Sequence, residues 1–277
     1  MDDASIAWLL SPERLAPFLT ITGAEHDAIA LHNQSIRLNA AIMPVVALIE
    51  IGLRNAISEQ LRTKLRVPNW LTAPPPSRLA WHGKEKDNIK KAILHAQRAA
   101  YAKLTHAEKK ALDAKAYPKG IPPGLPRSHR IKARQKQIAV GVGQTIAQLT
   151  LSFWKGLFSA DYEAVLWKPV LRRLFPNKAI GRADVARHLE VIYEARNRIA
   201  HHEALLGGRL ESLLESIDYI AQNFGATLPS TDAVMYRMTA PFRALLETEA
   251  EATRALINRY ALAPLGSSKY DARPGDT

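Results

Sequence analysis

Apolar residues recur along this chain at spacings of three and four, the period of an amphipathic helix. A serine that can cap a helix, followed by a proline that fits its first turn, predicts a helix start at residues 11–13. No segment shows the sustained alternation of apolar and polar residues that half-buried strands need. We therefore predict an all-α fold, with helices at residues 24–43, 45–65, 84–116 (interrupted near Thr105), 132–158, 162–174, 183–203, 210–224 and 230–260.

Prolines divide this helical pattern. Pro44 is expected to end or kink one helix, Pro68 stops the next, and three consecutive prolines break the chain at residues 74–76. Residues 117–126 hold four prolines and two glycines and are expected to form a loop. We predict one helical domain over residues 1–262 with a proline-bounded basic insert at 68–131. A flexible tail is expected at 263–277.

Positive charge is concentrated in that insert. The formal net charge of the chain is +12, yet residues 62–136 hold 19 Lys and Arg against 4 Asp and Glu, while the rest holds 19 and 22. Such a block attracts polyanions, although it could also be a solvated face or linker. Trp70, Trp81, Tyr101 and Tyr117 could stack on bases or serve as core residues. The candidate RNA-binding residues are Lys84, Lys86, Lys90, Lys91, Arg127, Arg130, Lys132 and Arg134.

Several classes of protein are disfavoured. Cysteine is absent, which removes disulfides and Cys-ligated zinc. The N-terminus is acidic, and the longest apolar run (residues 40–49) is shorter than a membrane span needs, so we expect a cytoplasmic protein without a membrane partner. His201 and His202 are adjacent rather than four apart, and His26 and His32 stand alone, so no metal is expected. No nucleotide-binding or hydrolase motif occurs, and no cofactor is predicted.

Two predicted helices carry charge on an apolar face. At about 100° per residue, Glu50 and Arg54 share a sector with Val46, Ile57 and Leu61. Likewise, Arg196 shares a face with Leu189, Ile192, Ile199, Ala200 and Glu203. Buried charges must pair or line a wet cleft. Glu50 and Arg54 can pair within one turn, and Arg196 can pair with Glu203 or Glu50. These residues therefore form either internal salt bridges or part of a site.

The residues that follow Arg196 favour a site. Within eight positions the chain places Arg196, Asn197, His201, His202 and Glu203. A histidine can pass a proton in either direction near neutral pH, and an arginine can hold a phosphate and stabilise added negative charge. Those are the two groups that metal-free RNA cleavage needs. On a continuous helix, however, Arg196 and His201 lie about 140° apart. Either the helix breaks near Ala200 or a second subunit completes the site.

The segment Arg196-Asn197-x-x-Ala200-His201-His202 resembles the Arg-x(4–6)-His signature of HEPN ribonucleases. More specifically, the chain resembles the Abi-like (AbiD/AbiF-type) abortive-infection proteins. This resemblance runs from about residue 10 to 225 and also rests on residues 15–19, on Glu50-Ile51-Gly52-Leu53-Arg54-Asn55, and on residues 149–158 with Phe153-Trp154. The basic segment after Pro68 matches least.

The resemblance implies a HEPN-like helical bundle, here with additional helices, that acts as a homodimer with motifs meeting across the interface. It implies a metal-independent endoribonuclease that leaves a 2′,3′-cyclic phosphate and a 5′-hydroxyl. Arg196 then binds phosphate, His201 (or His202) is catalytic and Asn197 orients them, with Glu50, Arg54 and Asn55 as support. The implied role is antiphage defence, or a toxin restrained by a partner such as a small RNA. A non-catalytic RNA-binding or scaffold protein with the same fold is the alternative.

Overall fold

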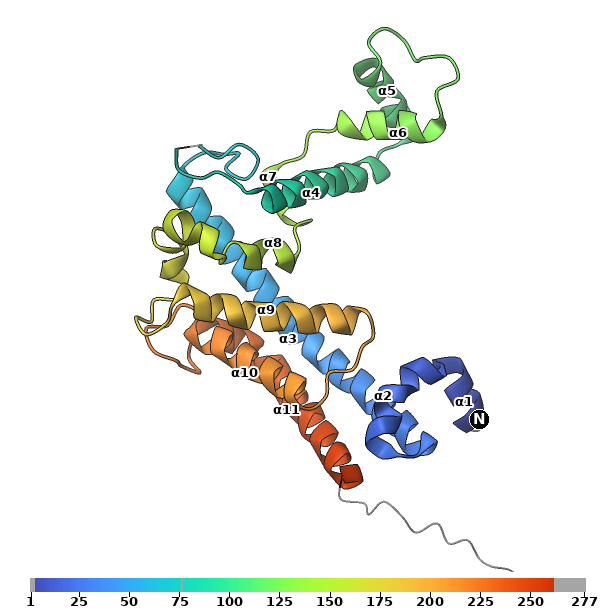
Figure 1. The fold of residues 1–277 in the computed structure, drawn as a ribbon. Helices are drawn as coiled ribbons and strands as arrows, with labels where there is room; N and C mark the ends of the chain where they lie inside the picture. The colour runs from blue at the N-terminus through green and yellow to red at the C-terminus, as the bar shows by residue number, and fades with distance from the viewer. Residues whose placement is uncertain (1–2, 76, 262–277) are drawn as a thin grey trace, which may run out of the picture.

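The computed structural model describes residues 3–75 and 77–261 (Figure 1). Helices account for all the regular structure in those ranges, which confirms the predicted all-α class. The α-helices are α1 (Asp3–Leu10), α2 (Pro12–Thr22), α3 (Glu25–Leu65), α4 (Gly83–Ala102), α5 (His106–Ala116), α6 (Arg127–Lys136), α7 (Val142–Ile146), α8 (Leu151–Gly156), α9 (Arg182–Ala200), α10 (Gly208–Asn223) and α11 (Val234–Ala261). Between α8 and α9 lie two 3-10 helices, η1 (Ala160–Tyr162) and η3 (Leu171–Leu174), and the π-helix η2 (Glu163–Trp167).

Helix α3 is the axis of the molecule (Figure 1). It runs for 41 residues straight through Pro44, so the prediction of two helices separated at this proline was wrong. A proline inside a helix removes one backbone hydrogen bond. Here the residues on both sides of Pro44 are buried in the main core, namely Ala41, Ile42, Val45 and Val46. This packing keeps the turns before and after the proline helical. Tertiary burial therefore outweighs the local cost of the proline.

The apolar character of α3 also satisfies a simple membrane criterion. An 18-residue window reaches a mean hydropathy of 1.8, and 44% of that window is buried inside the molecule. Core helices of soluble proteins have the same length and composition. Helix α3 packs against α11, α2, α8 and α9, which cover part of its apolar surface within the fold.

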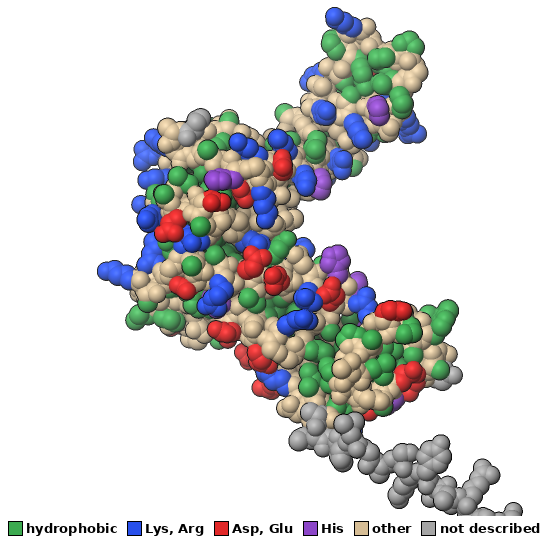
Figure 2. All heavy atoms as spheres, viewed as in Figure 1, with side chains coloured by type: hydrophobic (Ala, Val, Ile, Leu, Met, Phe, Trp, Pro, Cys, Tyr) green, Lys and Arg blue, Asp and Glu red, His purple; other side chains and the backbone are tan. Residues whose placement is uncertain are grey.

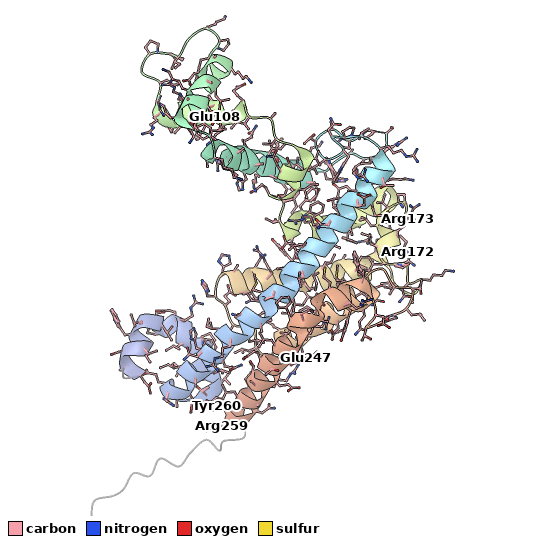
Figure 3. All side chains as sticks on the ribbon, turned by 180° about the vertical axis from the view of Figure 1, so that it is seen from behind. Glu108, Arg172, Arg173, Glu247, Arg259 and Tyr260 are labelled. Carbon is pink, nitrogen blue, oxygen red and sulfur yellow. The ribbon has the colours of Figure 1, made fainter. Side chains whose placement is uncertain are left out.

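Helices α9, α10 and α11 build the body around α3. Helix α11 runs antiparallel beside α3, because Asp27 near the start of α3 accepts a hydrogen bond from Tyr260 (3.1 Å) near the end of α11, and Gly52 lies against Met238 (Figure 3). Helix α10 packs between α9 and α11. At the other end, α2 covers the first turns of α3, where Phe18 meets His32 edge-on.

The basic insert begins in the core and ends as an arm. Trp70, Leu71 and Trp81 are buried in the main cluster, and the Trp81 indole donates to the Leu71 carbonyl at 2.8 Å. Helix α4 then leads away from the body and carries α5 and α6 at its far end (Figure 1). Tyr101 is buried as well, and Tyr117 is half-buried. The core interpretation is therefore confirmed for Trp70, Trp81 and Tyr101, and base stacking by them is excluded.

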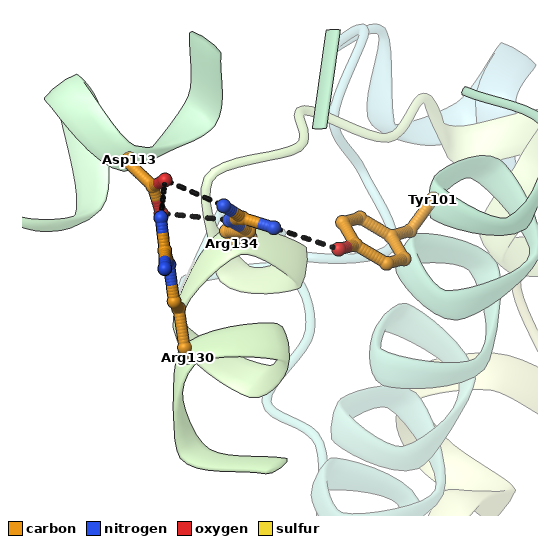
Figure 4. Close-up of polar contacts among 4 residues, drawn as sticks. All are labelled: Tyr101, Asp113, Arg130 and Arg134. Atoms are coloured by element: carbon orange, nitrogen blue, oxygen red, sulfur yellow. Dashed lines mark hydrogen bonds and ion pairs between the residues drawn. The ribbon is translucent and has the colours of Figure 1, made fainter. Parts of the chain in front are cut away.

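Helices α5 and α6 are held together by one carboxylate. Asp113 of α5 accepts from the Nε atoms of Arg130 (3.1 Å) and Arg134 (2.7 Å) of α6, and Arg134 also reaches the Tyr101 hydroxyl at 3.5 Å (Figure 4). Two arginines on one carboxylate keep the pKa of Asp113 far below its usual range. The predicted break near Thr105 is confirmed, since Thr105 caps α5 in a capping box with Glu108.

The segment between the arm and α9 departs most from prediction. The single helix expected at 132–158 is three helices, α6 to α8, separated by turns that include Gly141 and Thr150 as N-caps. The helix expected at 162–174 is divided among η1, η2 and η3, with Pro169 between η2 and η3. The helix expected at 183–203 ends three residues earlier, at Ala200. The tail predicted at 263–277 lies outside the described residues.

Candidate functional site

The segment singled out from the sequence lies at the C-terminal end of α9. The helix ends at Ala200, near the break that was one of the two alternatives considered, and His201 is its C-cap with φ −97° and ψ 12°. The His201 backbone N–H still donates to the carbonyls of Asn197 and Arg198, both at 3.1 Å. His201 therefore stays close to helical register. His202 is the first residue to leave that register, with a left-handed φ of 58°.

Because His201 remains near helical register, the angle of about 140° between it and Arg196 largely persists in one chain. Arg196 is half-buried and His201 is exposed. No hydrogen bond or ion pair joins Arg196 to either histidine in the described part of the chain. The structure thus places the three side chains at one helix end without bringing them to a common point within a single protomer.

Arg196 instead faces Glu50 on α3. Both side chains are half-buried, and burial raises the pKa of the Glu50 carboxyl above its usual value. The strongest opposing influence is the charge of Arg196, followed by Arg54 and a hydrogen bond from the Leu151 amide. Glu50 is therefore the point at which α3, α8 and α9 meet. Of the two partners considered for Arg196, the structure favours Glu50.

Glu203 has other partners. Its carboxylate pairs with Arg198 at 2.7 Å, and its backbone amide donates to the Arg198 carbonyl at 2.8 Å. The Glu203 carbonyl accepts from the Asn39 side chain of α3 at 3.4 Å. Of the two alternative partners of Arg196, Glu203 is engaged elsewhere, because the turn after Ala200 directs it back toward Arg198. Glu203 fixes this turn.

Arg54 lies one turn after Glu50 on the same face of α3, and Asn55 follows it toward the exposed side. The Arg54 Nε donates to the Asn55 side-chain oxygen at 3.4 Å. Both residues line a cavity of about 480 Å³ that also involves Trp70 and Ile146. Arg54 acts on Glu50 through its charge, whereas Asn55 is exposed at the edge of this cavity.

A polar cluster that the sequence analysis missed joins α8 to α9. Asn197 and Ser152 hydrogen-bond to the Tyr193 hydroxyl and lower its pKa, and the positive charges of Lys155 and Lys84 act in the same direction. The Lys155 ammonium lies 4.4 Å from the centre of the Tyr193 ring. Tyr193 and Asn197 are four residues apart on one face of α9, and this spacing in the sequence already indicates that their side chains can meet. The cluster holds Asn197, one of the predicted site residues.

Beside the histidines lies a shallow cavity of about 390 Å³. His202, Arg198 and Arg209 line it together with Arg14 of α2, and the Arg14 guanidinium donates to the His202 carbonyl. The cavity brings three arginines to the turn that follows α9. It contains His202 rather than His201, so the choice between the two histidines stays open.

The candidate RNA-binding residues fall into two groups. Arg130 and Arg134 are engaged with Asp113, so their charge is partly neutralised within the arm. The others are exposed: Lys84, Lys86, Lys90, Lys91, Arg127 and Lys132. Figure 2 shows basic side chains along the arm and an open notch between the arm and the end of α9. A polyanion that enters this notch contacts both the basic side chains of the arm and the end of α9.

Within residues 3–75 and 77–261, no group of three or more His, Asp or Glu side chains is placed to hold a metal ion. Compared with known proteins, the chain matches no family model, and no match was found among curated proteins or solved structures.

Proposed function

We propose that this protein is a metal-independent endoribonuclease of the cytoplasm that acts in antiphage defence or as a toxin. The observation that carries the proposal is the end of α9. There the exposed His201 follows, within five residues, Arg196, whose charge acts on Glu50 of α3, and Asn197, which hydrogen-bonds to the Tyr193 hydroxyl on the same helix. A guanidinium and an exposed imidazole at the same helix end supply the two groups that metal-free phosphodiester cleavage needs. The family resemblance adds weight to this proposal.

The proposed reaction uses the ribose 2′-oxygen as nucleophile. His201 accepts the 2′-hydroxyl proton while this oxygen attacks the adjacent phosphorus. Arg196 stabilises the extra negative charge of the pentacoordinate phosphorus, and Asn197 donates a hydrogen bond. The P–O5′ bond breaks, the leaving oxygen takes a proton from water to become a 5′-hydroxyl, and the protonated His201 returns its proton to the solvent. The other product carries a 2′,3′-cyclic phosphate.

A second copy of the chain completes the proposed site. In one protomer Arg196 and His201 diverge by about 140°, which is too wide an angle for both to reach one phosphate. Two α9 ends related by a two-fold axis bring the arginine of one protomer toward the histidine of the other. The proposed active form is therefore a homodimer.

RNA is the proposed partner of the arm. The exposed lysines of α4 and the notch beside α9 provide a positively charged path toward the motif. The same surface is suited to an inhibitory small RNA that blocks the notch. Either RNA binds mainly through its phosphates.

The test compares four purified variants on a mixed RNA substrate. His201→Ala and Arg196→Ala are expected to lose cleavage by roughly 10²–10⁴-fold while RNA binding persists. His202→Ala identifies which imidazole is catalytic. His95→Ala is the matched control, because His95 is an exposed histidine on α4, away from the motif. Cleavage that survives both histidine substitutions overturns the assignment of catalysis to this motif, whereas a wild-type protein that binds RNA without cleaving it supports the non-catalytic alternative.

A further inference from the structure

A large cavity lies away from the α9 motif, at the C-terminal end of α3. It has a volume of about 710 Å³ and is enclosed by the last turns of α3, by Arg78 and by the segment 164–173. In Figure 3, Arg173 lies beside this end of α3. Glu50 is 15 residues earlier on the same helix, so about 22 Å of helix separates the cavity from the candidate site.

Positive charge dominates the lining of this cavity. Four basic residues contribute to it, and no aspartate or glutamate does: Lys64, Arg66, Arg78 and Arg173. None of the four forms an ion pair with any described residue. Four neighbouring cations repel one another unless an anion lies among them. All four are exposed, so solvent screens much of this repulsion, and a ligand with several negative charges gains from contacting them together.

The backbone points to the same conclusion. Arg66 caps α3 in the left-handed conformation, with φ 54° and ψ 36°. Glycine or asparagine is the usual residue at such a position, since other side chains are strained there. An arginine at this position therefore costs stability while placing a guanidinium at the cavity. Arg78 has a separate structural task, since its guanidinium donates to the carbonyls of Lys64 and Leu65 (3.5 and 3.4 Å) at the end of α3.

The opposite wall is apolar. Val165, Leu166, Pro169 and Val170 contribute to it, and Val165 is 41% exposed. Small-molecule sites of roughly 300–1,000 Å³ combine an apolar wall with a few polar groups that fix orientation. An aromatic base can lie against such a wall while its phosphates face the cations. Inorganic phosphate alone leaves the apolar wall unused.

We propose that this cavity binds a nucleotide that carries more than one phosphate group. The ligand is either a free nucleoside triphosphate or the 5′-triphosphate end of an RNA, which present the same chemistry. The site is independent of Arg196 and His201, and binding does not require cleavage.

The experiment measures binding to the full-length protein by calorimetry. Its probes are ATP, GTP, pyrophosphate, and a ten-nucleotide RNA bearing either a 5′-triphosphate or a 5′-hydroxyl. The double variant Arg66→Asn/Arg173→Gln removes two of the cations, and asparagine tolerates the left-handed backbone at position 66. Arg37→Gln/Arg62→Gln is the control, because it removes two exposed charges of α3 that do not line the cavity.

A nucleoside triphosphate is expected to bind at least ten-fold more weakly to the double variant than to the control, with pyrophosphate competing. Preference for triphosphate RNA over hydroxyl RNA that disappears in the double variant identifies the RNA end as the ligand. His201→Ala is expected to bind as the wild type does, whatever its cleavage activity. Equal affinity of the double variant and the control, or no binding of any triphosphate probe, overturns the proposal.

Discussion

Glu50 on α3 and Arg196 on α9 oppose each other across the helix interface that supports the candidate motif. Burial raises the pKa of Glu50, and the positive charge of Arg196 is the main influence that limits this rise. A carboxyl whose pKa is raised in the folded state favours folding while it is protonated. Its ionisation therefore weakens the fold, and Arg196 reduces this cost.

Glu50→Gln is expected to stabilise the protein at neutral pH. Because the folded pKa of Glu50 is above the usual value of 4.5, its contribution to stability is fully present below that value. The contribution is lost as pH rises through the folded pKa. The gain from Glu50→Gln should therefore grow as pH rises above 4.5 and vanish below it. Urea unfolding of both proteins from pH 4 to pH 8 measures this difference.

Glu59→Gln is the control for that series. Glu59 lies on the same helix, is exposed, and has a lowered pKa because it accepts from Arg62. Its stabilising effect is present above pH 4.5 and lost in acid, so its substitution should act in the opposite direction and weakly. A Glu50→Gln variant that is less stable than wild type at pH 7 contradicts the expected stabilisation. That result would mean that the attraction between Glu50 and Arg196 outweighs the cost of burying the Glu50 charge.

Two isoleucines of α3 give a direct test of its place in the core. Ile57 is fully buried, whereas Ile51 is 41% exposed. Ile57→Ala is expected to lower the free energy of unfolding by about 2–5 kcal/mol, through reduced burial and a new cavity. Ile51→Ala is expected to change it by about 0.5 kcal/mol or less. Equal losses for the two variants would mean that another surface covers Ile51 in solution.

The helical class and several helix ends could be predicted because the signals are local. Ser11 with Pro12, and Thr105 with Glu108, cap their helices as their sequences indicate. The continuity of α3 through Pro44 could not be predicted, since it depends on packing from α11, which contacts α3 before the proline at Gln34 and after it at Gly52. The division of residues 132–174 into several short helices also depends on tertiary packing. Buried aromatic residues there, such as Trp154 and Tyr162, fix the chain through tertiary packing rather than helical period.

The candidate site was predictable to a similar extent. The proximity of Glu50 and Arg196 could be expected because each is a charge on an apolar helix face, and a buried charge is costly unless an opposite charge lies near it. The Tyr193–Asn197–Ser152 cluster did not follow, because Ser152 lies on a helix whose start the sequence did not indicate. The basic cavity at the end of α3 unites residues about a hundred positions apart, and only the fold brings Arg66 to Arg173.

Tyr193→Phe tests whether that cluster positions Asn197. The substitution removes the hydroxyl that Asn197 and Ser152 share and leaves the ring beneath Lys155. The removal of one hydrogen bond of about 1 kcal/mol corresponds to a decrease of roughly 5-fold in kcat for RNA cleavage, with KM unchanged. Phe153→Leu, a core change on α8, is the control for general loosening. Should kcat stay at the wild-type value, Tyr193 has no positioning role.

Asp113→Asn is expected to loosen the tip of the arm. The carboxylate holds Arg130 and Arg134, and an amide cannot form the same ion pairs. Backbone amides of α5 and α6 should exchange hydrogen faster, while those of α3 and α9 stay protected. The wild type should show the same loosening in acid, because the lowered pKa of Asp113 makes its contribution disappear only well below pH 3.8. Unchanged exchange in α5 and α6 would show that their apolar packing suffices.

The two groups of basic residues on the arm should affect RNA binding differently. Lys86, Lys90 and Lys91 are exposed on α4, and only a weak exposed ion pair joins Lys90 to Asp87 at 3.6 Å, so their triple substitution by glutamine removes phosphate-binding charges. RNA affinity should fall, and the slope of log K against log salt should decrease by up to about 0.7–0.9 for each phosphate that the variant no longer neutralises. Arg134→Gln removes one charge as well, but Arg134 is engaged with Asp113 and Tyr101. It should leave the salt slope nearly unchanged while lowering protection of α5 and α6. If the triple variant keeps the wild-type slope, RNA does not bind along α4, and the positive charge of this helix has a role other than RNA binding.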